Sequence, residues 1–584
     1  MSRGRPLPPW AMPAFFAGAA LLLASLSCRA LSKSEVRYVE AGWEMASRGD
    51  WVVPHLSFVP YFEKPAFTYW AQAVAQLLCG VSALATRLPS IASCLVMLWA
   101  TYAMGRELRG PRFGLGAAAL LLSGAAFTVM GTAVTTDPIF AAFLAVAGWA
   151  YVRHDRDPGG PWIWAFWTSL GFAWLTKGPL GVALAGTTVG AHLLFARRWR
   201  DILALRLARG VLVVTLINAP WTWLVWMRDP RFIPFFYVRE NFRAAVDSSV
   251  NHEGGWWYYA VVLPAACFPL ALVAAWAVGA ETVRAARRVL SSPSAAGSVG
   301  TKPGTRFLLV CMVVPPLLLL SVAQSKLPTY VLPVLPGVAL LVAWHVADRL
   351  AQPTRALRVL VPVTLGVVVL GLAFGWRSFT KDPDDAALVR AFAGHVVAVI
   401  ALIVAGLAAA SWFTLRGAVL RGYGVLAAAS AAATLAVLPV VDAATADRDA
   451  GELVAKMAAV RVPGERVVLC GSSSADYTVT LGLRERPLVW GFARETGMGH
   501  FTEVTAHDVP LPREPYEVCA ATLPQNPWLV DDAKFKAIWT APERAWVIGR
   551  PRDMEKVQNL GLPLHEFARN GYRVVATNLP GPGK

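Results

Sequence analysis

The residues best suited to chemistry lie in short polar segments that interrupt long apolar runs. Near the N-terminus two such segments read SKSEVRYVE and YFEKP. Their charged residues include Glu35, Arg37, Glu40, Glu63 and Lys64. Charges held beside a membrane are costly unless they are paired or used, so this grouping favours a binding site. Arg and Lys side chains are suited to bind a lipid phosphate. The plainer alternative is interfacial anchoring, in which basic side chains snorkel and aromatic rings form a belt.

Further polar residues stand at the edges of later apolar runs. Asp137 lies in VTTDPIF at the mouth of a run, where an acid is more often functional than decorative. The alternative is that Asp137 caps a helix begun by Pro138. His252 precedes the aromatic stretch WWYY, and a single His cannot specify a metal site. Lys326 and Tyr330 flank a proline-restricted helix entry in SKLPTYVLP, where anchoring is again the alternative.

The composition indicates that these segments lie in or beside a membrane. Of 584 residues, 56% are hydrophobic and 16% are charged, whereas a soluble domain has about 25% charged residues. Apolar runs of about 20 residues recur until about residue 441, so the chain is neither a soluble enzyme nor a disordered chain. An outer-membrane barrel would show only alternating hydrophobicity. Most Arg of the +17 net charge lies in short loops, which indicates topology and attraction to anionic lipid, with no nucleic acid.

The sequence therefore predicts a polytopic α-helical membrane protein with about 13 transmembrane helices. One follows the basic N-terminus MSRGR, and the others are expected at 86–104, 114–133, 138–153, 161–176, 178–196, 209–227, 256–280, 306–323, 329–349, 357–376, 391–413 and 421–441. Ala66–Gly80 is too short to cross and is expected to be an interfacial helix. If Ala66–Gly80 is not counted as a transmembrane helix, every Arg-rich loop lies on the cytoplasmic side, as the positive-inside rule requires. The polar segments that carry the candidate site residues then all lie on the external side of the membrane.

Two domains are expected. Residues 1–441 form the transmembrane domain, with a first external loop at 30–85, and residues 442–584 form an external α/β domain. In this second part charged helical segments alternate with short apolar strands such as ERVVLCG and RAWVIGR. Cys470 and Cys519 both fall there, and the sequence leaves open whether they pair.

In order, SEVRYVE, YFEKP, RLPS, TDP, LTKGPLG, NFR…WWYY and SKLPTYVLP resemble a known family. The chain is similar to the bacterial aminoarabinose transferases of lipid A. More broadly it resembles the protein mannosyltransferase-like superfamily of polyprenyl-phosphate-sugar transferases with the GT-C fold. The resemblance runs from about residue 30 to 340. It depends on the order and spacing of the motifs, since no single motif is specific.

The resemblance implies roles for individual residues. Lys64 and Arg37, with Tyr61 and Tyr330 nearby, would hold the phosphate of undecaprenyl phosphate. Glu63 and His252 match the pair that binds zinc, the one cofactor that the resemblance suggests; no nucleotide is expected. Asp137 matches the acid of the donor-sugar cavity, and Lys64 would also act in catalysis. The family's first-loop Asp is replaced by Ser34, so Glu35 or Asp137 would have to serve as general base.

The function expected from these residues is an integral membrane glycosyltransferase of the bacterial inner membrane, with its active site facing the periplasm. It would move a sugar, 4-amino-4-deoxy-L-arabinose or a similar one, from undecaprenyl phosphate to lipid A or another envelope glycolipid. We expect a monomer. The alternatives are a polyprenyl-phosphate-mannose-type protein or glycolipid glycosyltransferase and, in another class, a lipid-linked-sugar transporter or flippase. A flippase would hold ionisable residues in the middle of its spans, whereas this chain concentrates them at one face. A non-catalytic membrane scaffold would leave the charges of the first loop unexplained.

Overall fold

The chain divides into two compact units. A computed structural model describes residues 7–29, 31, 33–56, 59–243, 254–291, 305–349, 363, 392–416, 418–446, 451–470, 487–490, 529–570 and 573–580. The first unit comprises Met1–Cys28, Arg87–Trp223 and Asn241–Val440, and the second comprises Arg29–Thr86, Leu224–Glu240 and Val441–Lys584. The first external loop, which the sequence assigned to the transmembrane domain, thus belongs to the same unit as the C-terminal segment.

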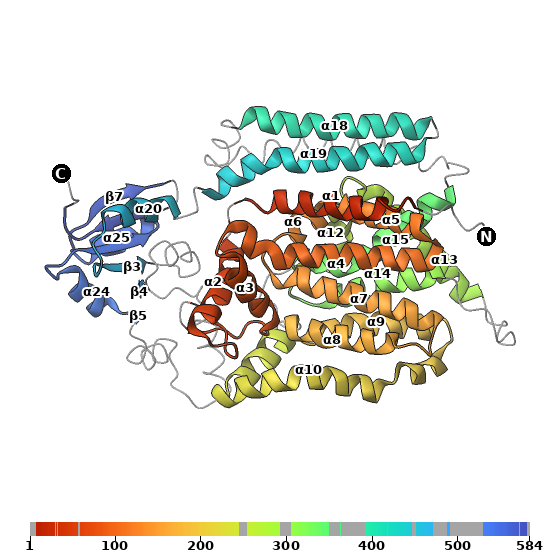
Figure 1. Cartoon of the computed structure of the whole chain (residues 1–584), viewed down its shortest axis with the longest axis horizontal. Helices are drawn as coiled ribbons and strands as arrows, with labels where there is room; N and C mark the ends of the chain where they lie inside the picture. Colours follow the sequence, from red (N-terminus) through yellow and green to blue (C-terminus); the bar gives the residue numbers. More distant parts are fainter. Residues whose placement is uncertain are drawn as a thin grey trace. The chain divides into compact units, whose positions relative to one another are not determined.

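The first unit is a bundle of helices (Figure 1). Its elements, with the helices that lead into it and out of it, are α1 (Ala11–Leu26), α4 (Ala83–Arg109), α5 (Pro111–Leu122), α6 (Ala125–Gly131), α7 (Thr136–Arg156), α8 (Trp162–Lys177), α9 (Leu180–Phe195), η1 (Trp199–Leu205), α10 (Leu207–Arg228), α12 (Tyr258–Ala266), α13 (Ala271–Ser291), α14 (Thr305–Val322), η5 (Pro328–Val334), α15 (Leu335–Arg349), α18 (Ala393–Leu415) and α19 (Val419–Ala446). Within the described ranges, four helical segments are long and apolar enough to cross a membrane: α4, α10, Pro328–Asp348 and α18. The chain is a multi-pass membrane protein. The count of about 13 spans stays a prediction, and the span at 357–376 lies outside the described residues apart from Val363.

Two expected spans are each built from two helices. The run at 114–133 is divided into α5 and α6, which meet at an angle of 66° around the extended residue Gly124. The run at 256–280 is divided into α12 and α13, and the break contains Pro269. Proline lacks the backbone N–H that a continuing helix needs. Hydropathy missed both breaks because Gly and Pro do not interrupt an apolar run.

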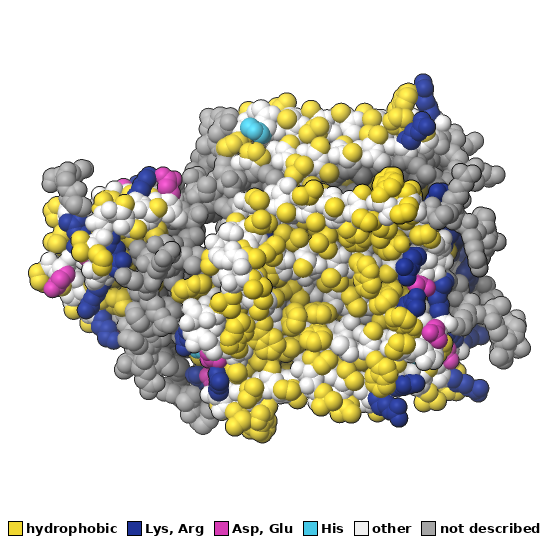
Figure 2. All heavy atoms as spheres, viewed as in Figure 1, with side chains coloured by type: hydrophobic (Ala, Val, Ile, Leu, Met, Phe, Trp, Pro, Cys, Tyr) yellow, Lys and Arg dark blue, Asp and Glu magenta, His cyan; other side chains and the backbone are white. Residues whose placement is uncertain are grey.

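Ion pairs gather the Arg-rich connections at one end of the bundle. Arg153 at the end of α7 contacts Glu107 at the end of α4, with 2.5 Å between Nη1 and Oε1. Asp155 accepts from Arg198, which follows α9, at 2.6 Å. On the face seen in Figure 2, hydrophobic side chains cover the length of the helices, and Lys and Arg gather near helix ends. These connections share one side of the bundle, as the positive-inside rule requires.

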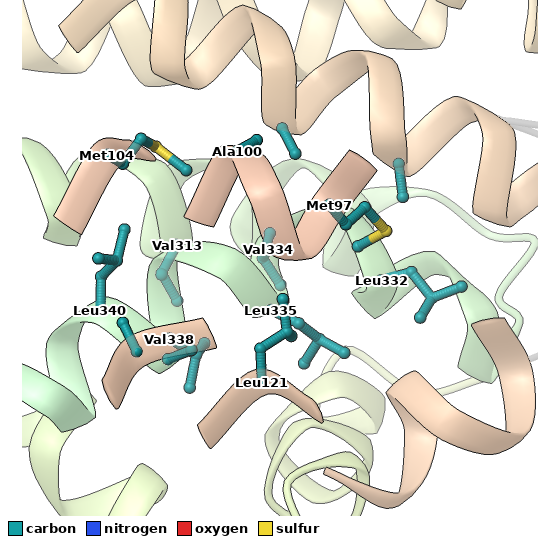
Figure 3. Packing of buried hydrophobic residues seen from close by; sticks show 14 of the residues in the cluster. Met97, Ala100, Met104, Leu121, Val313, Leu332, Val334, Leu335, Val338 and Leu340 are labelled. Atoms are coloured by element: carbon teal, nitrogen blue, oxygen red, sulfur yellow. The ribbon is translucent and has the colours of Figure 1, made fainter. Parts of the chain in front are cut away.

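The core of the bundle lies where α15 passes α4 and α5. In Figure 3, Met97 and Met104 of α4 point toward the side chains of η5 and α15. Leu335 and Leu340 are at most 4% exposed. The packing fixes α15, and with it η5, against one wall of the bundle.

The second unit begins with a helical hairpin. Its N-terminal elements are α2 (Lys33–Arg48), β1 (His55–Leu56), β2 (Val59–Pro60) and α3 (Phe67–Cys79), and η2 (Pro234–Arg243) begins in the same unit. The expected helix at Ala66–Gly80 is confirmed as α3; its place at the membrane surface stays a prediction. A Cβ at Gly42 of α2 would lie 2.5 Å from the Cβ of Gln72 in α3, so only glycine allows the two helices to approach this closely.

The C-terminal segment contains a mixed sheet. Its strands are β3 (Arg466–Cys470), β4 (Leu488–Trp490), β5 (Leu529–Val530), β6 (Ala545–Gly549), β7 (His565–Arg569) and β8 (Val574–Thr577), in the order β5-β4-β3-β6-β8-β7. The first four pair in parallel, and β8 is antiparallel to both β6 and β7. The accompanying helices are α20 (Gly451–Val460), α24 (Asp532–Trp539) and α25 (Pro551–Asn559). Cys470 is buried and its Sγ lies 3.8 Å from the carbonyl oxygen of Asp553, whereas Cys519 lies outside the described residues, so whether the two pair stays open.

The contact between α4 and α5 gives a direct test of the bundle. A Cβ at Gly114 would lie 2.4 Å from the carbonyl oxygen of Tyr102, whereas a Cβ at Gly116 meets nothing within 4 Å. We expect Gly114→Ala to destabilise the protein by about 1–3 kcal/mol through overpacking. Gly116→Ala is expected to be neutral or slightly stabilising, because Ala is a better helix former than Gly. Thermal unfolding of both purified variants checks this, and equal melting temperatures would contradict the packing.

Candidate active site

The loop that reads YFEKP is anchored by two buried aromatic residues. Tyr61 is 3% exposed and Phe62 is 1% exposed. The ring of Phe62 meets that of Phe232 edge-on, with 5.5 Å between the ring centres. The next two residues, Glu63 and Lys64, are only partly buried. The anchored rings therefore hold the two charged side chains in place at the edge of the unit.

Arg37 and Glu63 form the first ion pair of the site. The distance between Arg37 Nη1 and Glu63 Oε2 is 3.6 Å. Tyr61 donates a hydrogen bond of 2.6 Å to the same Oε2. Burial raises the pKa of Tyr61 well above its ordinary value, so its hydroxyl stays a donor. Burial alone would lower the pKa of Arg37, but Tyr61 and Glu63 raise it above its ordinary value, so Arg37 carries a permanent positive charge.

Lys64 forms the second ion pair. Its Nζ lies 3.5 Å from Oε2 of Glu240 in η2 and donates a bond of 2.8 Å to the carbonyl oxygen of Glu63. Both Lys64 and Arg37 thus meet their carboxylates at distances longer than the usual 2.7–2.9 Å of a charge-assisted hydrogen bond. The structure therefore brings Arg37, Tyr61, Glu63 and Lys64 together, and we call this group the cationic cluster.

Glu35 does not join the cationic cluster. It is 2% exposed and its Oε1 lies 3.4 Å from Nη2 of Arg29. Glu35 and Arg37 are two residues apart on α2, and residues at that spacing do not face each other on a helix. The side chain of Ser34 lies outside the described part. Glu35 as a general base stays a prediction.

Asp137 belongs to a second group, in the first unit. Thr135, not Asp137, is the N-cap of α7, and its hydroxyl accepts from the backbone N–H of Asp137. The interpretation of Asp137 as the helix cap is therefore wrong. The Asp137 carboxylate instead pairs closely with Lys177 at the end of α8, and both side chains are at most 10% exposed. The Nζ of Lys177 also lies 4.1 Å from the ring centre of Tyr330, within the range of a cation–π contact. We call Asp137, Lys177 and Tyr330 the acidic cluster.

Two hydrogen bonds hold the segment that carries Tyr330. Lys326 donates from Nζ to the carbonyl oxygen of Gly254 at 2.7 Å. Tyr259 of α12 donates to the carbonyl oxygen of Leu327 at 3.3 Å. Lys326 is 4% exposed, so it is a structural part of the tip between α14 and η5 and does not reach outward as a snorkelling anchor.

The predicted zinc pair is only half described. His252 lies outside the described residues, and Glu63 is already engaged by Tyr61 and Arg37. Among the residues that the structure describes there is no group of three His, Cys, Asp or Glu able to hold a metal ion. A carboxylate facing a guanidinium and a hydroxyl donor is a poor first ligand for a dication. Zinc binding by Glu63 and His252 therefore stays a prediction.

Two site residues were missed by the sequence analysis. Lys177 lies in the motif LTKGPLG but was given no role, although α7 and α8 are consecutive helices of one hairpin. The start of the first and the end of the second must then meet, so TDP and LTKGP could have been paired. Glu240 left no such signal, because it is 176 residues from Lys64 in sequence.

The buried pair of the acidic cluster predicts a coupled mutational effect. Asp137→Asn and Lys177→Met should each lower stability by about 3–5 kcal/mol, since each leaves an unpaired buried charge. The double variant should lose less than the sum of both. Arg228→Gln breaks a half-exposed pair with Asp50 and should cost about 0–1 kcal/mol. Thermal unfolding of the four variants measures this, and additive single effects would exclude the pairing.

His55 of β1 predicts how the loop responds to acid. Burial, together with the charge of Arg48, lowers the pKa of His55 from its ordinary value of 6.5 to about 4. The unfolded chain then binds more protons between pH 6.5 and 4, so this contribution to stability is present above pH 6.5 and lost as the pH falls toward 4. Hydrogen exchange of residues 55–66 should therefore become faster between pH 7 and 5, after correction for the intrinsic rate. His55→Gln should remove that dependence, and an unchanged pH profile in the variant would contradict the assignment.

Comparison with known proteins agrees with the motifs. Residues 63–226, which include Lys64, Asp137 and Lys177, match the model of the dolichyl-phosphate-mannose-protein mannosyltransferase family. An undecaprenyl phosphate-alpha-4-amino-4-deoxy-L-arabinose arabinosyl transferase of Pectobacterium carotovorum is 32% identical over 360 residues, which cover 59% of this chain and 61% of that protein. A protein of the same name from Pseudomonas aeruginosa is 31% identical over 349 residues, covering 58% and 60%. The chain thus matches about three fifths of the length of these curated relatives.

A solved structure extends the likeness in fold to nearly the whole chain. The crystal structure of ArnT from Cupriavidus metallidurans bound to undecaprenyl phosphate superposes with a TM-score of 0.80 at 23% identity, covering 98% of this chain and 100% of that one. The apo structure of the same protein gives a TM-score of 0.78. The resemblance predicted from the motifs is therefore confirmed, and this chain is a multi-pass helical membrane protein with the fold of ArnT.

Proposed function

We propose that this chain is an integral membrane glycosyltransferase that moves a sugar from undecaprenyl phosphate to an acceptor at the outer face of the bacterial inner membrane. The observation that carries the proposal is the geometry of the cationic cluster. Arg37 and Lys64 are fixed side by side on one loop and helix, and each meets its carboxylate at 3.5 Å or more. A phosphate oxygen could meet both cations at the 2.7–2.9 Å of a charge-assisted hydrogen bond, closer than these two carboxylates.

The chemistry needs such a pair of cations. The acceptor oxygen would form a bond to the anomeric carbon, while the bond from that carbon to the phosphate oxygen breaks with its electron pair. Negative charge then grows on the departing undecaprenyl phosphate. Lys64 and Arg37 would stabilise this charge where it develops, which is the form of electrostatic catalysis that usually contributes most. The carrier phosphate is already a leaving group, so no nucleotide is required.

The ion pairs of the two candidate general bases affect which acceptor the site could use. Asp137 and Glu35 are both buried and ion-paired, so either must give up a cation before it can take a proton. A hydroxyl acceptor needs a base, and such catalysis contributes about 10²–10⁴-fold. A phosphate acceptor, as on lipid A, is already anionic and needs little base. The geometry therefore favours a phosphate-bearing glycolipid, with lipid A the first candidate, over the hydroxyl acceptor of a mannosyltransferase-type reaction.

We propose the transferred sugar from the names of the relatives. The ion pair of Asp137 limits how that sugar could bind. 4-Amino-4-deoxy-L-arabinose carries an ammonium that a carboxylate could bind. Lys177 already neutralises Asp137, so the sugar would have to share this carboxylate with a buried lysine. A neutral sugar could instead hydrogen-bond to the same oxygens.

The remaining features of the proposal follow from the same arrangement. The acidic cluster and the ion-paired Arg-rich connections lie at opposite ends of the bundle helices, so the acidic cluster faces the periplasm if the Arg-rich end is cytoplasmic. We propose a monomer, and zinc binding by Glu63 and His252 stays a prediction. The flippase alternative predicts transport without transfer, and the test below separates the two.

Removing the cations tests the enzyme directly. Lys64→Ala and Arg37→Ala should each lower sugar transfer by about 10²–10³-fold, the loss typical for one electrostatic donor at a transition state. Both should also weaken binding of undecaprenyl phosphate to the purified protein. Arg48→Gln is the matched control, because Arg48 lies on the same helix and pairs with Glu44 of its own helix. Unchanged lipid binding in Lys64→Ala would defeat the assignment.

Mass spectrometry of the cell envelope identifies the acceptor. Lipid A from cells with and without the protein should differ by the mass of one or two transferred sugars. A scan of other envelope glycolipids and proteins in the same extracts covers the alternatives. An unmodified lipid A with a modified protein or glycolipid would move the assignment to the mannosyltransferase-type reaction, and no modification in any fraction would favour the flippase.

A further inference from the structure

Tyr69 of α3 carries a buried hydroxyl that has no partner in the described part of the chain. The residue is 0% exposed. Among the residues that the structure describes, none forms a hydrogen bond with its Oη. A buried polar group that is left unpaired costs free energy, so each such group in a folded protein needs an explanation.

Packing fixes the ring of Tyr69 between α2 and α3, which lie side by side (Figure 1). Tyr69 and Ala73 share one face of α3, because they are four residues apart. On that face a Cβ at Gly42 of α2 would lie 3.1 Å from the backbone nitrogen of Ala73. The ring of Tyr38 stacks on the ring of Tyr69 with 6.2 Å between their centres, and the ring of Tyr61 meets it edge-on at 6.0 Å. The hydroxyl therefore has a fixed place beside the cationic cluster.

The charges of the cationic cluster act on this hydroxyl. Burial raises the pKa of Tyr69 well above its ordinary value, and Tyr38 and Glu63 raise this pKa further. Arg37 acts in the opposite direction. Interactions of this kind weaken with distance, so the hydroxyl lies near both members of the pair between Arg37 and Glu63. It keeps its proton and is available as a hydrogen-bond donor.

The carboxylate of Glu63 can accept one more hydrogen bond. Tyr61 donates to its Oε2 at 2.6 Å, and Arg37 Nη1 lies 3.6 Å from the same oxygen. A carboxylate has two oxygens with about four lone-pair sites, so these two contacts do not exhaust it. An additional donor near Glu63 therefore has an acceptor within the same cluster.

Binding of a phosphate would create the need for that donor. Under the proposed function Arg37 turns from Glu63 to the phosphate of the carrier, and Glu63 then loses the cation with which it is paired. The side chain of Glu63 is only 18% exposed, so water replaces little of the lost interaction. Tyr61 alone would remain as its side-chain donor. A second hydroxyl would lower the cost of releasing Arg37.

We infer, on the basis of the proposed transfer, that Tyr69 is a positioning residue that donates its hydroxyl to Glu63 when Arg37 turns to the carrier phosphate. In the free protein this hydroxyl is unpaired within the described residues, and in the bound protein Tyr61 and Tyr69 together hold Glu63. A group that is satisfied only in the bound state shifts the equilibrium toward that state by the free energy of its bond. Tyr69 thus strengthens the binding of the carrier without touching it.

Tyr69→Phe tests the inference, because it keeps the ring and removes only the hydroxyl. In the purified full chain this variant should weaken binding of undecaprenyl phosphate about tenfold, as expected for the loss of one hydrogen bond to a charged group. The KM for undecaprenyl-phosphate sugar should rise by a similar factor with unchanged turnover, because Arg37 has already turned to the phosphate in the bound ground state. The melting temperature of the free protein should stay the same or rise, since the bond is not made there.

Two neighbouring residues provide matched controls. Thr68→Val removes another buried hydroxyl that lacks a partner among the described residues, and adjacent positions of a helix do not share a face. This variant should leave both lipid binding and KM unchanged. Tyr61→Phe removes a hydrogen bond that the free protein already makes, so it should lower the melting temperature, in contrast to Tyr69→Phe.

The same substitution in a Glu63→Gln background decides how the hydroxyl acts. Without the charge of Glu63 the release of Arg37 costs little, so Tyr69→Phe should then no longer weaken lipid binding. A tenfold effect that persists there would mean that the hydroxyl contacts the phosphate itself, and it would overturn the inference. A lower melting temperature of Tyr69→Phe, or unchanged lipid binding in it, would do the same. A wild-type chain that binds no undecaprenyl phosphate would instead contradict the proposed function.

Discussion

The cost of holding charge away from water is the constraint on which the rest of this structure depends. Each of the three cations Arg37, Lys64 and Lys177 is paired with a carboxylate. The pairs differ in how firmly they are made. The pair of Lys177 is close and its side chains are at most 10% exposed, whereas those of Arg37 and Lys64 are longer and only partly buried. Distance and burial thus separate a structural ion pair from cations that a ligand can still recruit.

The same constraint organises the Arg-rich end of the bundle. Arg-rich connections there are neutralised by Glu107, Asp155 and Asp348, each placed at or near a helix terminus. These pairs do more than balance charge, because each joins helices that are distant in sequence.

Much of the architecture could be predicted from local sequence, because it depends on local patterns. Apolar length located most helices of the bundle, and the short run before Gly80 was correctly separated as a helix of its own, α3. The breaks within 114–133 and 256–280 were not predictable from hydropathy, which treats Gly124 and Pro269 as apolar. A helix broken by backbone geometry has the same composition as a continuous one.

The candidate site was predictable where its residues are neighbours in sequence and only there. Arg37, Glu63 and Lys64 were grouped because the first external loop carries all three. Tyr61 joined them through the family resemblance. The partners of Lys64 and Asp137 come from other elements, and their identity depends on how helices pack. The role of Asp137 as a helix cap was wrong for the same reason: Thr135 could be judged locally, but the salt bridge to Lys177 could not.

The pairing of every candidate acid also explains why the substitution of Ser34 at the family's acidic position can be tolerated. A site that relied on a general base would need at least one carboxylate that is ready to take a proton. Glu35 and Asp137 are instead committed to Arg29 and Lys177. A transfer between two phosphates makes no such demand, since the donor leaves as an anion and the acceptor arrives as one. Under the proposed function, what that reaction needs is positive charge held in position, and Arg37 and Lys64 would supply it.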